Sequence, residues 1–208
     1  MLQMYAIAIN GSPRKGGNTE ILLKEVLSEL KKADWEVELV QVGGTDIRGC
    51  IACGQCQKKK NNKCALDKDV FNKVFKKMVR ADAILCGSPT YFAAVSADLK
   101  ALLERAGFVA LSNENAFAGK IGAAVVAVRR GGATHAFDTI NHMFQMSRMI
   151  IPGSTYWNMG YGLEKGDVQG DDEGLNNMRH LGQTIDWLGR AINPCLSHYP
   201  NSHAVVEE

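Results

Sequence analysis

Four cysteines crowd into one short segment of the chain, CIACGQCQKKKNNKC, with the spacing C-x2-C-x2-C-x7-C. Three cysteines at three-residue intervals can wrap a compact inorganic cluster, and a fourth can arrive after a loop, as in bacterial ferredoxin-type sites. Structural zinc favours two separated pairs, so it fits this spacing less well. We therefore predict a [4Fe–4S] cluster, with thiols or disulfides without metal and zinc as the alternatives; the predicted ligands are Cys50, Cys53, Cys56 and Cys64.

A second candidate site is the loop INGSPRKGGNTE (9–20), which is rich in glycine, hydroxyls and positive charge. It precedes an amphipathic run, and the free N–H groups at the start of a helix favour an anion. The dinucleotide fingerprint fails because Ser12 and Pro13 follow the first glycine, and the P-loop fails because Gly17 and Asn18 stand where Lys and Ser or Thr are needed. The loop therefore suits one terminal phosphate, unless its serine and asparagine merely cap the helix.

Two further loops carry residues that suit a flat ligand. In GSPTYF (87–92), a stiff turn places two aromatic side chains beside the end of an apolar run, where a ring could lie against them. In VRRGGATH (128–135), two arginines and two glycines suit a loop that faces an anion or a carbonyl group. Plain packing of the aromatics and a solvated turn are the alternative interpretations of these loops.

The elements that position these loops alternate along the chain. Short apolar runs predict buried strands at 4–10, 35–42, 82–89 and 120–128, and a fifth strand within 150–160. Apolar residues at helical spacing predict helices at 21–31, 67–81, 96–107, 134–149 and 171–192, with Gly107 as a C-terminal stop. This alternation predicts a doubly wound α/β domain with a parallel sheet, whose ligands bind at the carboxyl ends of the strands.

Composition excludes several classes of protein. Hydrophobic residues make up 46% of the 208 residues, and the net charge is only +2, so neither a nucleic-acid partner nor a membrane surface is expected. No apolar run approaches the roughly 20 residues of a membrane span. The N-terminus has no signal-peptide pattern, so we expect a cytoplasmic protein whose cysteines stay reduced.

The motifs GSPRKGGNT, GSPTYF leading into SADLKALLER, and RGG together resemble the flavodoxin-like NADPH-dependent FMN reductases, and most of all the iron–sulfur flavoproteins, over roughly residues 4–190. The resemblance implies a flavodoxin-like, doubly wound, five-stranded parallel sheet in three α/β/α layers. It implies one FMN-binding domain over 1–192, with a cysteine-rich insertion at 47–66 and a C-terminal tail at 193–208.

The resemblance also implies where FMN binds. The phosphate side is assigned to Ser12, Arg14, Gly17, Asn18 and Thr19, and the ring side to Pro89, Thr90, Tyr91, Phe92, Gly131 and Gly132. Tyr156 and Trp157 are further candidates for the edge of a flavin site. The gap before Cys64 is longer than in the iron–sulfur flavoproteins because of the insertion KKKNNK.

We therefore expect an FMN-dependent oxidoreductase with NAD(P)H as co-substrate, a small-molecule or ferredoxin-like electron acceptor, and a homodimeric or homotetrameric assembly. No protein acid or base is assigned, since the chemistry would be that of the cofactor. The rivals are a ferredoxin-coupled carrier without nicotinamide activity and a non-flavin phosphate-binding module with zinc. The lysine-rich loop is a docking patch or, as charge runs usually are, a solvated loop; its members are Lys58, Lys59, Lys60 and Lys63.

Overall fold

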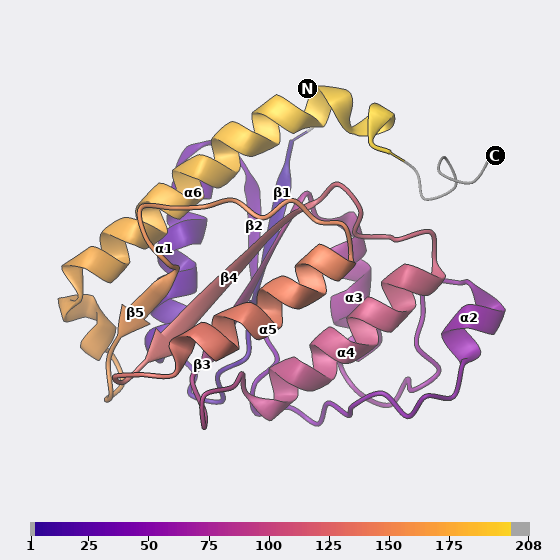
Figure 1. The fold of residues 1–208 in the computed structure, drawn as a ribbon, viewed down its shortest axis with the longest axis horizontal. Helices are drawn as coiled ribbons and strands as arrows, with labels where there is room; N and C mark the ends of the chain where they lie inside the picture. The colour runs from indigo at the N-terminus through magenta and orange to yellow at the C-terminus, as the bar shows by residue number, and fades with distance from the viewer. Residues whose placement is uncertain (1–2, 201–208) are drawn as a thin grey trace.

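The computed structural model describes residues 3–200, and in it five parallel strands form one sheet between two layers of helices (Figure 1). The order across the sheet is β2-β1-β3-β4-β5, which confirms the predicted doubly wound fold class. The strands are β1 (Tyr5–Asn10), β2 (Glu36–Gln41), β3 (Ala83–Pro89), β4 (Ile121–Val128) and β5 (Met159–Tyr161). The helices are α1 (Asn18–Lys32), α2 (Gln55–Lys59), α3 (Phe71–Arg80), α4 (Ala97–Ser112), α5 (Ala133–Met146) and α6 (Asp172–Ile192), with 3-10 turns η1 (Asp167–Gly170) and η2 (Asn193–His198).

The central strands are buried on both faces, which explains their nearly continuous apolar sequences. Along β1, Ala6 and Ala8 face one core cluster, whereas Tyr5, Ile7 and Ile9 face the other. Small residues on the first face let α1 and α6 approach the sheet closely, and α3, α4 and α5 cover the second face (Figure 1). The alternation of side chains along a strand therefore supplies two cores from one short sequence.

The reversal of strand order lies between β1 and β3, where the two backbones come close together. The N–H of Gly11 donates to the carbonyl O of Gly87 at 2.8 Å. Ser96, which caps α4, donates its hydroxyl to the carbonyl O of Gly11 at 2.6 Å and accepts from the N–H of Leu99. The crossover helix α1 leaves β1 over one face of the sheet and α4 leaves β3 over the other, so a crevice opens at this point.

Several predicted boundaries are wrong: the helix predicted at 67–81 begins at Phe71, and the helix predicted at 134–149 ends at Met146. Gly107 does not end a helix, because α4 continues to Ser112, where Asn113 bonds the carbonyl O of Val109 through its side chain. The fifth strand occupies only the end of the predicted 150–160 segment, and Ile150 makes an isolated bridge to Ile121.

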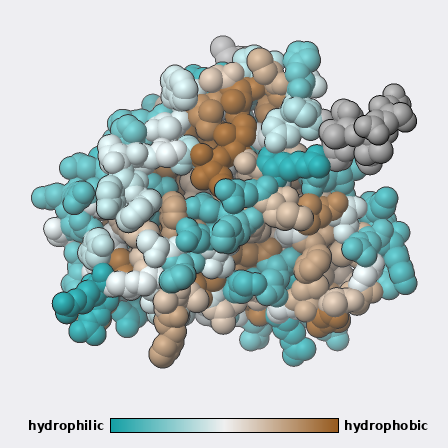
Figure 2. Space-filling model, in the orientation of Figure 1, coloured by the Kyte–Doolittle hydropathy of each residue, from teal (hydrophilic) through white to brown (hydrophobic). Residues whose placement is uncertain are grey.

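The remaining segments are short or lie on the surface. The helix α2 inside the cysteine segment was not predicted, and the tail forms η2 before it reaches residues 201–208, which lie outside the described residues. No helix within 3–200 combines the length and apolar character that crossing a membrane requires. Figure 2 shows apolar side chains among polar ones over α4 and α5, where Phe108, Leu111 and Met146 are exposed.

We expect Gly11→Ala to lower the free energy of unfolding by about 1–3 kcal/mol through overpacking. An added Cβ would lie 2.7 Å from the Cβ of Leu99 and 2.9 Å from the carbonyl O of Gly87. Equilibrium denaturation in guanidinium chloride measures the change. Gly153→Ala is the matched control, because an added Cβ there meets nothing within 4 Å, and a change of less than about 0.5 kcal/mol is expected. Equal losses in the two variants would contradict the close approach of β1 and β3.

Candidate functional site

The loop between β1 and α1 presents unpaired N–H groups at the start of a 15-residue helix. Gly17 is the N-cap of α1, and no side chain caps this turn. Among the described residues, no hydrogen bond engages the N–H groups of Asn18, Thr19 and Glu20. This arrangement attracts an anion, and the alternative that Ser12 and Asn18 serve only as caps is not what the loop adopts.

The carboxylate of Glu20 lies at the same turn but is already paired. It accepts the N–H of Gly16 at 2.5 Å and lies 2.6 Å from the ammonium of Lys24. The hydrogen bond from Lys24 holds the pKa of Glu20 below its usual value. The negative charge is thus compensated locally, and the three free N–H groups remain available to a ligand.

The polar side chains of this loop form hydrogen bonds partly within the loop and partly with residues 163–168. Ser12 is buried and its hydroxyl accepts the N–H of Arg14. Arg14 donates to the carbonyl O of Leu163 at 3.2 Å. The side-chain amide of Asn18 bonds to residues 164–168: it donates to the carbonyl O of Glu164 and accepts from the N–H groups of Gly166 and Val168. The Oδ1 of Asn18 is thus committed to this segment, and the backbone N–H of Asn18 stays available to a ligand.

A pocket of about 250 Å³ gathers most of the predicted flavin residues at the carboxyl edge of the sheet. The predicted residues that line it are Ser12, Arg14, Asn18, Thr19, Pro89, Thr90 and Tyr91. Arg129, one of the two arginines singled out in VRRGGATH, also lines it, and the residues that sequence reasoning missed are Ala127, Gly162, Leu163 and Lys165. The glycine-rich sequence MGYGLEKG (159–166) was a signal for Gly162, Leu163 and Lys165. In the structure this segment lies close to the first loop, because a Cβ on Gly162 would lie 2.6 Å from the side-chain nitrogen of Asn18.

One wall of this pocket carries a buried polar atom without a partner. The N–H of Thr90 donates to the carbonyl O of Ala127, but the Thr90 Oγ1 is buried and has no hydrogen-bond partner within residues 3–200. Buried hydroxyls are normally satisfied, so this atom calls for a ligand with a polar edge. FMN combines a phosphate with a ring whose rim bears carbonyl and N–H groups, and the residues present fit both parts.

The ring-side loops lie against each other. Residues 91–94 close a tight turn in which Tyr91 and Ala94 exchange two backbone hydrogen bonds, with Phe92 at φ 49° and Ala93 at φ 60°. Such left-handed residues are strained and collect at ligand-binding loops. Phe92 projects fully into solvent and lines neither the phosphate pocket nor the larger cavity at β5. Gly132 is also left-handed, and a Cβ there would lie 3.1 Å from the Cβ of Ala93.

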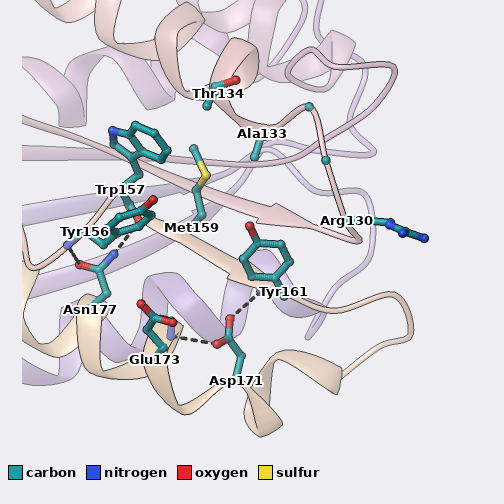
Figure 3. Close-up of a pocket in the computed structure, with 13 residues that line it drawn as sticks. Arg130, Ala133, Thr134, Tyr156, Trp157, Met159, Tyr161, Asp171, Glu173 and Asn177 are labelled. Atoms are coloured by element: carbon teal, nitrogen blue, oxygen red, sulfur yellow. Dashed lines mark hydrogen bonds between the residues drawn. The ribbon is translucent and has the colours of Figure 1, made fainter.

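A second cavity of about 500 Å³ lies beyond these loops, at the sheet edge formed by β5 (Figure 3). Gly131 and Gly132 line this cavity rather than the phosphate pocket. In Figure 3, Trp157, Met159 and Tyr161 lie across its floor, Glu173 rises from α6, and Arg130 points away. Aromatic residues that are more than half exposed inside a concave site suit a planar ligand.

The walls of this cavity are fixed by Asp171, the N-cap of α6, and by Asn177 within that helix. The carboxylate of Asp171 accepts the N–H groups of Tyr161 and Gly174. Asn177 is buried; it accepts from the N–H of Tyr156 and donates to the carbonyl O of Trp157 at 2.6 Å. The sequence analysis singled out Tyr156 and Trp157 but had no signal for Asp171 and Asn177. The role of Asn177 depends on a contact with Trp157, which lies 20 residues away along the chain.

The four cysteines of the cysteine segment line one small cavity of about 20 Å³ against α4. All four are free thiols, and Cys53 is the most exposed of them. Cys64 is held in place because its N–H and carbonyl O both bond the side chain of Asn72 on α3. The long gap before Cys64 therefore does not separate it from the other three cysteines.

The four cysteines supply the donor type that an iron–sulfur cluster takes. Within residues 3–200, no group of three or more His, Cys, Asp or Glu side chains is close enough to hold a single ion. Four thiols around one cavity are nevertheless the ligand set that a [4Fe–4S] cluster takes. Cys86 is different, because it is buried in β3 and burial raises the pKa of its thiol to about 12.

Comparisons with known proteins identify the family. The family model described as NADPH-dependent FMN reductase matches residues 4–164. An iron–sulfur flavoprotein of Methanocaldococcus jannaschii is 35% identical over 189 residues, covering 88% of this chain and 95% of the relative. An iron–sulfur flavoprotein of Methanosarcina thermophila is 33% identical over 153 residues, covering 72% and 78%.

Solved structures share the fold. RosB with a bound intermediate superposes with a TM-score of 0.72 at 18% identity, covering 92% of this chain and 81% of that chain. A flavodoxin from the domain Archaea superposes with a TM-score of 0.58 at 16% identity, covering 90% and 99%. At these identities the likeness establishes the three-layer α/β fold that sequence analysis expected, and nothing about ligands.

Proposed function

The chain belongs to the NADPH-dependent FMN reductase family, close to the iron–sulfur flavoproteins, and from this premise we propose that it is an NAD(P)H-dependent FMN oxidoreductase that also carries a [4Fe–4S] cluster. Membership of the family supports FMN as the cofactor. The use of NAD(P)H and the cluster are the finer parts of the proposal. Each is supported by a separate group of residues.

The observation that carries the flavin assignment is the phosphate pocket, where unpaired donors converge. The free N–H groups at the start of α1, the Ser12 and Thr19 hydroxyls and the Arg14 guanidinium would hold the phosphate. Lys165 lines the same pocket and adds positive charge. The unpartnered Thr90 Oγ1 would meet the polar rim of the ring. FMN supplies hydride acceptance and one- or two-electron release, and these residues bind and orient it.

We assign the nicotinamide ring of the co-substrate NAD(P)H to the cavity at β5. It is lined by Gly131 and Gly132, and Gly132 also borders the turn at 91–94. A nicotinamide ring there would stack on Trp157 and Tyr161, and the cavity walls would keep bulk water from that face.

Electron transfer to a ferredoxin-like acceptor and assembly into a homodimer or homotetramer stay predictions. The four lysines near Cys64 are all exposed, as both the docking and the solvated interpretations require. Phe108, Leu111 and Met146 are the kind of exposed apolar side chains that subunit contacts cover.

The experiment that tests the whole proposal is an anaerobic absorption spectrum with counts of FMN, iron and sulfide per chain. We expect one FMN per chain, together with the iron and sulfide of one [4Fe–4S] cluster. A colourless protein that contains zinc would overturn the proposal in favour of a phosphate-binding module with a zinc site.

We expect Arg14→Ala to weaken FMN binding by about 1.5–3 kcal/mol, which is the range for a lost charged hydrogen bond. Titration of the apoprotein with FMN by calorimetry gives the affinity. Lys15→Ala is the matched control, because Lys15 carries the same charge in the same loop but does not line the pocket. Equal effects of the two substitutions would show only long-range charge and would remove Arg14 from the phosphate site.

We expect Cys53→Ala to lose iron and sulfide while FMN remains bound, since the flavin and cysteine sites share no lining residue. Elemental analysis and the flavin spectrum of the anaerobically purified variant measure the two contents. Cys195→Ala, an exposed cysteine in η2, serves as the control and should keep the iron. Wild-type iron in Cys53→Ala would contradict the assigned ligand set.

We expect NADH or NADPH to bleach the flavin absorbance anaerobically, and Trp157→Ala to raise the KM for the nicotinamide by about 2- to 10-fold, with a smaller change in kcat. Trp187→Ala is the control, because Trp187 is 69% exposed on α6 and lies outside the cavity. An unchanged KM would move the nicotinamide elsewhere. No bleaching by either nicotinamide, with fast reduction by ferredoxin, would favour the carrier.

A further inference from the structure

Arg105 is a buried cation on the inner side of α4. Its side chain has no exposed surface, and the guanidinium carbon lies 4.1 Å from the centre of the Phe71 ring. Arginine is rarely buried without strong compensation, because moving a charge out of water is costly. Its surroundings therefore have to supply that compensation.

Only part of the guanidinium is compensated by the chain itself. Its Nη1 donates to the carbonyl O of Arg48 at 3.1 Å and to the carboxylate of Asp69, and its Nη2 donates to the carbonyl O of Leu66 at 2.7 Å. The Nε–H is buried and has no partner among the described residues. A charged donor left unpaired in the interior is expensive, so a ligand for it is expected.

The cavity beside Arg105 is the one that the four cysteines line. Arg105 forms part of its wall, together with Phe108 and Val109 from the next turn of α4. Asp69 does not line this cavity. The positive end of the Arg105–Asp69 pair is therefore the end that faces the cysteines, and the negative end lies behind it.

Burial and hydrogen bonding act in opposite directions on Asp69. Burial alone would raise the pKa of this carboxyl, but hydrogen bonds from Arg105 and from the N–H groups of Phe71 and Arg48 lower it, and the pKa lies below its usual value. Asp69 thus remains ionised, and the pair is a fixed dipole in a medium of low dielectric constant.

We propose that Arg105 is a positioning residue for the iron–sulfur cluster, donating its free Nε–H to a cysteine thiolate or a cluster sulfide and raising the cluster's reduction potential. The proposal rests on the cluster assignment made above. Reduction adds one negative charge to the cluster, so a nearby positive charge and hydrogen bonds to sulfur stabilise the reduced form.

A purely structural role is the alternative, because Arg105 also ties residues 48, 66 and 69 to α4. That role would affect stability and iron retention but would leave the potential of an assembled cluster unchanged. The two roles are separated by a measurement of potential, which activity alone does not provide.

The test is an anaerobic redox titration of the intact protein, with the cluster followed by electron paramagnetic resonance and the flavin by absorbance. We expect Arg105→Gln to lower the cluster potential and Asp69→Asn to raise it, since the second change leaves the guanidinium charge uncompensated. Arg105→Lys keeps the charge but loses the Nε–H, so its potential should fall less than that of Arg105→Gln. The flavin potential should stay constant throughout.

Lys100→Gln is the matched control, because it removes a positive charge from the same helix at a solvent-exposed ion pair with Glu104. Screening by water should leave the cluster potential near that of the wild type. Opposite shifts in Arg105→Gln and Asp69→Asn support the inference, and unchanged potentials in both overturn it. If Arg105→Gln fails to keep iron, the Asp69→Asn shift decides. A wild-type protein without iron contradicts the cluster assignment itself, which is a different result.

Discussion

The close approach of β1 and β3 at their carboxyl ends is the contact on which the rest of the molecule depends. Gly11 and Gly87 meet through one backbone hydrogen bond, and the hydroxyl of Ser96 closes the contact from the start of α4. Because α1 and α4 leave these strands over opposite faces, their first turns diverge and leave a crevice with free N–H groups on one side. Everything proposed for the flavin follows from this crevice. A side chain on Gly11 would meet the backbone of Gly87 and the start of α4, and one on Gly87 would meet Thr19 and Leu23 of α1.

The sequence allowed the fold and the loops of the phosphate pocket to be predicted, because both are encoded locally. Buried parallel strands are apolar throughout, and a glycine-rich loop before an amphipathic helix is a short-range pattern. What could not be predicted depends on contacts between distant segments. The role of Asn18 is set by residues 164–168, and the walls of the second cavity are set by Asp171 and Asn177 on α6. A glycine such as Gly107 often ends a helix, but here α4 continues past it. A side chain would also fit at this position, because an added Cβ would come no closer than 3.9 Å to Met143.

For the cysteine segment, too, the local pattern could be predicted and the contacts with distant residues could not. Its spacing indicated a cluster, and the resemblance to iron–sulfur flavoproteins drew attention to the long gap before Cys64. The structure adds that Asn72 of α3 holds Cys64 against the cavity, while the extra residues 58–63 form the end of α2 and the exposed turn after it. Neither the packing of this segment on α4 nor the buried pair of Arg105 and Asp69 could be foreseen, because an arginine within an amphipathic helix is usually solvated.

The helix α4 joins the two candidate sites. Its N-cap, Ser96, closes the β1–β3 contact at the edge of the flavin crevice, and Arg105 faces the cysteine cavity nine positions later. At 1.5 Å per residue, these two points are about 14 Å apart along the helix axis. A rigid helix of this kind fixes the separation of the two sites within one chain, and hydrogen bonds tie its N-cap to Gly11 and its middle to Leu66. We therefore expect a charge change at Arg105 to act on the potential of the proposed cluster without moving the flavin crevice, so that the two candidate sites can be altered separately on one scaffold.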